Sequence, residues 1–114
     1  MYPAIKEKWI MALRSGEHKQ TKNMLLDYDG AQCCLGVLCD VVAEDMDVEK
    51  CPGTDPRTNG HYRDRNGSRM TTQLSSDLSN EVGLTRAQES QLITMNDTAG
   101  RDFSEIADYI ERNL

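Results

Sequence analysis

The 114-residue sequence lacks several patterns that mark large classes of proteins. No apolar run approaches the roughly 18 residues of a membrane-spanning helix, so we expect no membrane insertion. The N-terminal residues lack the charged, apolar and small-residue order of a signal peptide, and we therefore expect a soluble protein that is not exported. Internal repeats and low-complexity tracts are also absent, which excludes repeat architectures.

Sequence motifs of common enzymes and metal sites are missing as well. The glycines form no Walker or dinucleotide-binding pattern, and no serine lies in the elbow motif of a hydrolase. There is no Cys-x-x-Cys pair, so we expect no zinc site, and no other motif calls for a cofactor. In a reducing cytoplasm we expect free thiols. The four cysteines are Cys33, Cys34, Cys39 and Cys51. A zinc site that includes Cys51 and His61, or a cysteine nucleophile beside His18 or His61, is the alternative.

Charge is unevenly distributed along the chain. The formal net charge is −6, which argues against general nucleic-acid binding. Residues 27–49 contain seven acidic side chains and no Lys or Arg, whereas residues 1–22 and 57–69 are both basic. Such segregation predicts surface patches that bind partners or ligands.

Length and hydrophobic periodicity predict one α+β domain over residues 1–114, with about five helices around a small antiparallel sheet. Apolar residues at helical spacing predict helices near 4–15, 34–45, 75–82, 86–95 and 103–113. The segment 33–43 is the most apolar, so we place its helix at the centre, where Gly36 would let a neighbouring element approach closely. The expected core residues are Trp9, Leu35, Leu38, Ile106 and Ile110.

Turn signals predict the antiparallel strands. Asn66-Gly67 lies between residues 61–65 and 68–72 and predicts a hairpin with a two-residue turn. Asp29-Gly30 suggests a second hairpin that would pair residues 24–28 with 32–34. The rest of residues 44–72 is interpreted as an irregular insertion because glycines and prolines outnumber its apolar anchors.

Two basic segments are the candidate ligand-binding sites. The hairpin region has four guanidinium groups, which suit phosphate, and an aromatic ring that could stack on a base. Its candidate residues are Arg57, Tyr62, Arg63, Arg65 and Arg69, with Asn59 and Asn66 among them. Strand alternation would place Arg63 and Arg65 on one face. The loop after the first helix supplies Lys19, Gln20, Lys22 and Asn23. If the fold brings both segments together they form an anion pocket; otherwise they are solubilising charges.

Distinctive motifs occur near both ends and in the apolar centre of the chain. They are WxxALRSG at residues 9–16, KQ at 19–20, CCLGVLCD at 33–40, ND at 96–97 and FSEIADYIE at 103–111. In this combination the sequence resembles a family of small accessory proteins of tailed bacteriophages and prophages. The resemblance implies no catalytic residues, and it implies action in the cytoplasm of a bacterial host during infection. Such proteins often counter host defence by binding a defence protein or by sequestering a nucleotide signal.

The sequence therefore favours a binding protein over an enzyme. The leading hypothesis is an anti-defence protein, acting as a homo-oligomer, that sequesters a nucleotide-derived immune signal. The alternative is a protein–protein inhibitor of a host defence enzyme, which would use the acidic block 27–49 or an acidic helical face. That face contains Asp102, Glu105, Asp108 and Glu111. A small hydrolase or transferase is the third hypothesis.

Overall fold

Five helices and a three-stranded antiparallel sheet make up the computed structural model, which describes residues 1–114 and confirms the predicted α+β class. The helices are α1 (Pro3–Arg14), α2 (Cys34–Val42), α3 (Ser76–Val82), α4 (Arg86–Asp97) and α5 (Phe103–Asn113). The strands are β1 (Glu49–Cys51), β2 (His61–Arg63) and β3 (Arg69–Met70), and they pair in the order β1-β2-β3. None of the helices combines the length and the apolar character needed to cross a membrane.

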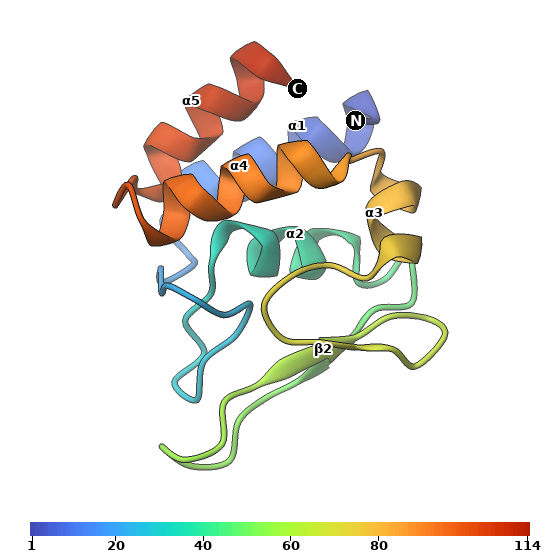
Figure 1. Cartoon of the computed structure of the whole chain (residues 1–114), viewed down its shortest axis with the longest axis vertical. Coiled ribbons are helices and arrows are strands. Elements are labelled where there is room, and N and C mark those ends of the chain that lie inside the picture. Colours follow the sequence, from blue (N-terminus) through green and yellow to red (C-terminus); the bar gives the residue numbers. More distant parts are fainter.

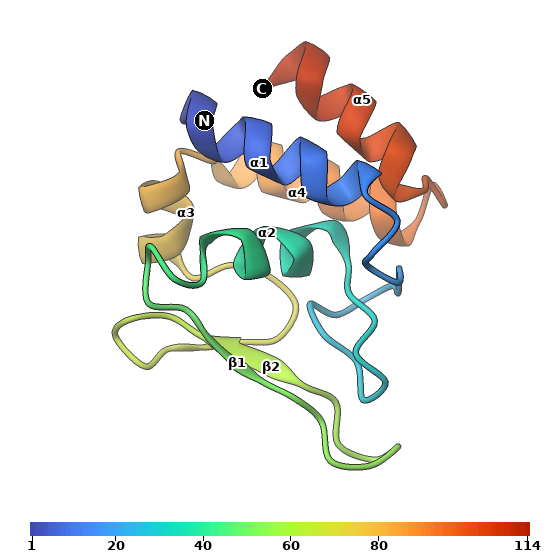
Figure 2. The ribbon, with the colours of Figure 1, turned by 180° about the vertical axis from the view of Figure 1, so that it is seen from behind.

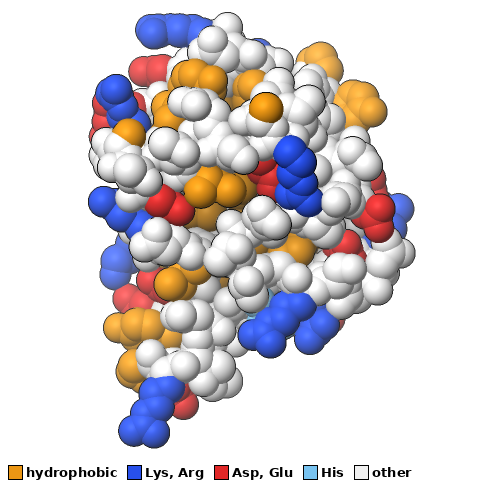
Figure 3. Space-filling view, viewed as in Figure 1, with side chains coloured by type: hydrophobic (Ala, Val, Ile, Leu, Met, Phe, Trp, Pro, Cys, Tyr) orange, Lys and Arg blue, Asp and Glu red, His pale blue; other side chains and the backbone are white.

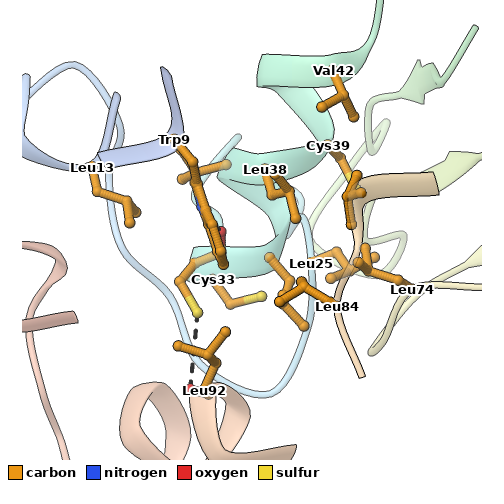
Figure 4. Close-up of a cluster of buried hydrophobic side chains, with 14 of the residues drawn as sticks. Trp9, Leu13, Leu25, Cys33, Leu38, Cys39, Val42, Leu74, Leu84 and Leu92 are labelled. Carbon is orange, nitrogen blue, oxygen red and sulfur yellow. Dashed lines mark hydrogen bonds between the residues drawn. The ribbon is translucent and has the colours of Figure 1, made fainter. Parts of the chain in front are cut away.

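Helix α2 lies between the other long helices and the sheet, at the centre of the core (Figures 1 and 2). Its side chains are buried from Cys34 to Cys39 because α1 and α4 cover one side of it and the sheet lies beyond the other. All five residues expected in the core are 0% exposed. Figure 4 shows Trp9, Leu38 and Leu92, from three different helices, meeting in this cluster. The predicted central helix is therefore confirmed.

Gly36 permits the close approach that the sequence predicted. A Cβ atom at this position would collide with the backbone carbonyl of Leu25. On the other side of α2, the indole of Trp9 donates a hydrogen bond of 2.9 Å to the carbonyl of Cys34. The apolar segment 33–43 is thus held by backbone contacts on two sides as well as by side-chain burial.

Helices α4 and α5 begin at capping boxes, whereas α2 ends earlier than the sequence predicted. Helices α4 and α5 begin with capping boxes formed by Thr85 with Gln88 and by Asp102 with Glu105. Helix α2 ends at Val42, three residues before the predicted end. Residues 44 and 45 are acidic and exposed, so no apolar face extends the helix, and Asp47 turns the chain with a positive φ of 52°.

The hairpin after β2 forms, but its loop has three residues instead of two. Arg63 pairs with Arg69, and the amide of Asp64 donates to the carbonyl of Ser68, so residues 65–67 form the turn. Gly67 has a φ of 81°, as a three-residue loop with a left-handed third position requires. The buried carboxylate of Asp64 accepts hydrogen bonds from the amides of Asn66 and Ser68 and fixes this longer turn.

Two other expectations, for residues 24–34 and for residues 49–51, are wrong. Residues 49–51 lie in the segment that was interpreted as irregular, yet they form β1 and pair with β2. The turn at Asp29-Gly30 closes, because the carboxylate of Asp27 accepts from the amides of Asp29 and Ala31, but it carries no strands. Only an isolated bridge joins Leu26 to Gln32, since the next residues enter helix α2.

Candidate anion-binding site

A polar cleft of about 390 Å³ lies where the loop before α2 meets the sheet hairpin. We name it the Arg57–Arg69 cleft. Its lining residues are Asn23, Met24, Arg57, Thr58, Asn59, Gly60, Arg69, Thr71 and Thr72. Two arginines and no carboxylate line it, so the side-chain charge of the lining is positive and favours an anion. Figure 3 shows Lys and Arg side chains at the sheet end of the molecule.

Backbone contacts bring the three segments of the cleft together. The amide of Leu25 donates to the carbonyl of Thr71 at 2.8 Å, which joins the first segment to the end of the hairpin. The amide of Tyr28 donates to Oδ1 of Asn59 at 3.1 Å, which joins the same segment to the loop before β2. This bond also occupies the amide oxygen of Asn59, so its amino group remains a donor for a ligand.

The guanidinium groups of Arg57 and Arg69 make no hydrogen bond and no ion pair within the chain. The local contact of Arg57 is through its backbone, whose amide donates to the carboxylate of Asp55. The other two predicted arginines are engaged: Arg65 forms an ion pair of 3.0 Å with Glu81, and Arg63 donates to the carbonyl of Gly67. Two of the four predicted arginines therefore have their full donor capacity available at one cleft.

The prediction for the other arginines requires a correction. Arg63 and Arg65 do not share a strand face, because β2 ends at Arg63 and Arg65 lies in the turn. Arg63 lies opposite Arg69 in the sheet register. Neither Arg63 nor Arg65 lines the Arg57–Arg69 cleft.

The predicted loop residues reach the cleft in part. Asn23 lines it, and Lys22, the preceding residue, is exposed. Lys19 forms an ion pair of 3.0 Å with Asp29 instead. The side-chain amide of Gln20 donates to Asn96 Oδ1 and to the carbonyl of Arg101, which makes it a structural contact. Of the loop after α1, Asn23 therefore lines the cleft together with Arg57 and Arg69, whereas Lys19 and Gln20 do not.

Tyr62 is buried and does not present its ring for base stacking. Its side chain is 0% exposed, because it lies on the sheet face that packs against α2. The phenol donates to Oδ1 of Asp40 at 2.8 Å and accepts from the amide of Gln32 at 2.7 Å. Burial, followed by the nearby Asp40 carboxylate, raises the pKa of Tyr62 far above its ordinary value. Tyr62 is therefore a core residue with a satisfied hydroxyl.

Uncharged residues of the cleft were not predicted from the sequence. Thr58, Thr71 and Thr72 line it with hydroxyl groups that donate and accept hydrogen bonds. These threonines lie within three residues of Arg57 or Arg69 in the chain. That proximity could have indicated them as site residues, since hydroxyl groups commonly accompany arginine at phosphate sites. Tyr28 is the exposed aromatic ring near the cleft: it is 49% exposed and is bonded through its amide to Asn59.

A second polar cluster surrounds Asp40. Lys50 forms an ion pair of 3.0 Å with its carboxylate, and the amide of Gln32 donates to the same oxygen at 2.8 Å. The Oε1 atom of Gln32 is 2.8 Å from Nδ1 of His18. Because this amide oxygen can only accept, Nδ1 of His18 carries the proton. These contacts join the loop after α1, helix α2 and the sheet, and none of these side chains lines a cleft.

Cysteines and histidines form no catalytic or metal-binding arrangement. Cys51 lies opposite His61 in the sheet register, but its thiol contacts Glu49 at 3.1 Å. Burial and the Glu49 carboxylate raise the pKa of Cys51, which disfavours the thiolate. Nowhere do three or more His, Cys, Asp or Glu side chains gather in a way that could hold a metal ion.

The acidic face of α5 is largely occupied by contacts within the chain. Arg14 of α1 forms ion pairs with Asp108 at 2.7 Å and with Glu111 at 2.9 Å. Arg101 forms an ion pair of 3.0 Å with Glu105. This face therefore offers less free negative charge to a basic partner than the sequence suggested.

Comparisons with known proteins give a family but no activity. A family model described as a domain of unknown function (DUF8296) matches residues 1–114. No curated protein and no solved structure matches the chain.

Proposed function

The chain belongs to the DUF8296 family, and for this member we propose a function in which the Arg57–Arg69 cleft binds a phosphorylated, nucleotide-derived small molecule and sequesters it. The observation that supports the proposal is the pair of arginines whose side chains have no partner in the chain and which line one carboxylate-free cleft. Surface arginines near carboxylates usually pair with them, as Arg65 and Arg14 do here.

Phosphate is the anion that this lining suits best. A guanidinium group donates two parallel hydrogen bonds to phosphate oxygens, and the threonine hydroxyls and the Asn59 amino group add neutral donors. Each charge-assisted hydrogen bond contributes about 1.5–3 kcal/mol in favourable settings. The chain as a whole has a net charge of −6, so a small anion at a local positive site is favoured over a long polyanion.

Sequestration requires that the protein bind its ligand, and it requires no catalysed reaction. The cleft is lined by Asn, Thr, Arg, Met and Gly residues, none of which is a nucleophile with an adjacent general base. A protein of this kind acts by lowering the free concentration of its ligand. Together with the resemblance to phage accessory proteins, this supports an anti-defence role in the cytoplasm of an infected bacterium. The working form that we propose is a homo-oligomer, because an interface between copies would enclose the ligand.

Arginine substitutions test the proposal directly. A panel of mono- and dinucleotides is screened by thermal shift, and a stabilising compound is then titrated by calorimetry. Arg57→Ala and Arg69→Ala are each expected to weaken its binding about ten- to a hundredfold, because about 1.4 kcal/mol corresponds to a factor of ten. The melting temperature of each free variant should stay within about 2 °C of the wild type, since neither side chain has a partner to lose.

Arg112→Ala is the matched control. Arg112 lies on α5, away from the sheet, is exposed, and does not line the Arg57–Arg69 cleft. This variant should bind the compound as the wild type does. An equal loss of affinity in the control, or no stabilisation by any phosphorylated compound at millimolar concentration, would contradict the proposal.

A second candidate function uses the turn after α2. Glu44, Asp45 and Asp47 lie within this turn, and all three are exposed and without an ion pair. These three carboxylates of the acidic block have no hydrogen-bond or ion-pair contact within the chain and remain free to contact a basic protein surface. If a host protein binds the chain, Glu44→Lys with Asp45→Lys should abolish that binding while the nucleotide affinity of the cleft is retained.

A further inference from the structure

A second polar hollow adjoins the Arg57–Arg69 cleft. It has a volume of about 360 Å³ and is lined by Arg69, Met70, Thr71, Thr72, Gln73, Leu74, Ser75, Ser76 and Arg86. Arg69, Thr71 and Thr72 line both spaces, so the two meet along this segment of the chain. Each space by itself lies near the lower end of the size range of small-molecule sites, and together they suit a larger ligand.

Arginine side chains line both spaces. No carboxylate lines either of them, and an arginine lies in each beyond the shared Arg69: Arg57 in the cleft and Arg86 in the second hollow. Arg86 is held at its position, because its guanidinium donates to the carbonyl of Leu74 at 2.9 Å and to Ser76 Oγ at 3.1 Å.

Arg86 contributes less positive charge than Arg57. Its guanidinium lies 3.2 Å from the carboxylate of Glu89, which is buried and offsets part of the charge. The second hollow therefore depends more on its neutral donors, which are the hydroxyls of Thr71, Thr72 and Ser76 and the amide of Gln73. Gln73 is exposed and its side chain has no hydrogen bond within the chain.

From this arrangement we propose that the ligand carries two separate phosphate groups, as a phosphodiester-linked dinucleotide does. This inference rests on the proposed function of the cleft. One phosphate binds between Arg57 and Arg69, and the second lies in the adjoining hollow among the hydroxyls. Arg69, at the junction, has enough N–H groups to donate to both phosphates. The negative net charge of the chain opposes a longer polyanion, so the ligand is a short one.

Two adenine compounds that differ in phosphate number test the inference. They are the dinucleoside monophosphate ApA and its 5′-phosphorylated form pApA, which share both adenosines and differ by one phosphate. For the wild type, pApA should bind at least about tenfold more tightly, which is the effect of about 1.4 kcal/mol from the second phosphate. Gln73→Glu places a carboxylate in the second hollow and should remove most of this gain, while the affinity for ApA changes less than about threefold. Arg57→Ala should weaken both compounds.

Gln91→Glu is the matched control, because it makes the same charge change at an exposed residue of α4 that lines neither space. This variant should retain the preference for pApA. Equal affinities of the two compounds for the wild type, or an equal loss for both compounds in Gln73→Glu, would overturn the two-phosphate inference and leave the proposed function intact. If neither these compounds nor any other phosphorylated compound binds the wild type, the proposed function fails as well.

Discussion

Tyr62 donates a hydrogen bond of 2.8 Å from its phenol to Oδ1 of Asp40, and this contact joins strand β2 to helix α2. Asp40 is the one charged residue of that apolar helix. The amide of Gln32 donates to both partners, at 2.7 Å to the phenol and at 2.8 Å to the carboxylate. The sheet is therefore attached to the helical core by a closed polar triangle as well as by apolar packing.

Tyr62→Phe should destabilise the protein by about 1.5–3 kcal/mol. The variant keeps the ring but removes a hydrogen bond to a charged acceptor, and it leaves the amide of Gln32 with one partner fewer. The measurement is the free energy of unfolding from urea denaturation. Tyr28→Phe, at a half-exposed ring, is the control and should cost less than about 0.5 kcal/mol. Equal stability of the two variants would contradict the structural role of the triangle.

Stability should fall in alkaline solution. Burial raises the pKa of Cys33 to about 11, and it raises the pKa values of Cys34, Cys39 and Tyr62 as well. In the unfolded chain these groups lose their protons near their ordinary values, whereas the folded protein retains them. The unfolded state then binds fewer protons, so the free energy of unfolding decreases as the pH rises.

The expected decline begins near pH 9, where unfolded thiols ionise, and steepens above about pH 10, where the unfolded tyrosine also ionises. Each group contributes a slope of at most about 1.4 kcal/mol per pH unit. Urea denaturation at a series of pH values measures it. Tyr62→Phe lacks one of these groups and should show a shallower decline above pH 10. A free energy of unfolding that is constant from pH 8 to 11 would show that these groups titrate in the folded protein.

In the native protein, Cys51 should react with thiol reagents faster than the other three cysteines. Cys33, Cys34 and Cys39 are buried, with exposures of 0–4%, whereas Cys51 is partly exposed at the sheet. With an aromatic disulfide reagent at pH 8, we expect one faster thiol and three that react only when the protein unfolds. Cys51→Ser should abolish the faster phase. Four equally fast thiols would contradict the packing of α2.

The helices could be predicted from the sequence because an apolar stripe is a local pattern. Phe103, Ile106 and Ile110 lie on one face of α5. Their spacing in the sequence predicts both that the segment is a helix and that this face is buried. Strand β1 gives no such signal, since it has three residues and none of them is fully buried. Its pairing with β2 depends on contacts that are distant in the sequence.

Candidate site residues were predictable by type but not by role. The four arginines stood out by type, yet nothing local shows that Arg65 meets Glu81 while Arg69 has no partner. Tyr62 resembled an exposed ring among charges, but strand alternation places it on the face that meets Asp40, 22 residues earlier in the chain. Such roles depend on tertiary pairing, which a single sequence does not encode locally.

Asn96 and Asp97 connect α4 to the loop that supplies Asn23 to the cleft. The buried amide of Asn96 donates to the carbonyl of Thr21 at 2.9 Å and to Asp97 Oδ1 at 2.8 Å. The same oxygen of Asp97 accepts from the backbone amide of Asn23 at 2.9 Å. Asn23 has a positive φ of 68°, an uncommon conformation for a residue with a side chain, and this contact holds it there.

Asp97→Ala should release Asn23 without unfolding the protein. The lost hydrogen bond has a charged acceptor and is worth about 1.5–3 kcal/mol, so the amide proton of Asn23 should exchange with solvent about ten- to a hundredfold faster. Asp97→Asn retains an acceptor oxygen and should restore most of the protection. Hydrogen exchange measured by NMR gives this result without any ligand. The affinity for adenosine 5′-monophosphate should fall in the alanine variant and recover in the asparagine variant. Unchanged exchange at Asn23 in Asp97→Ala would show that the loop conformation is held by other contacts.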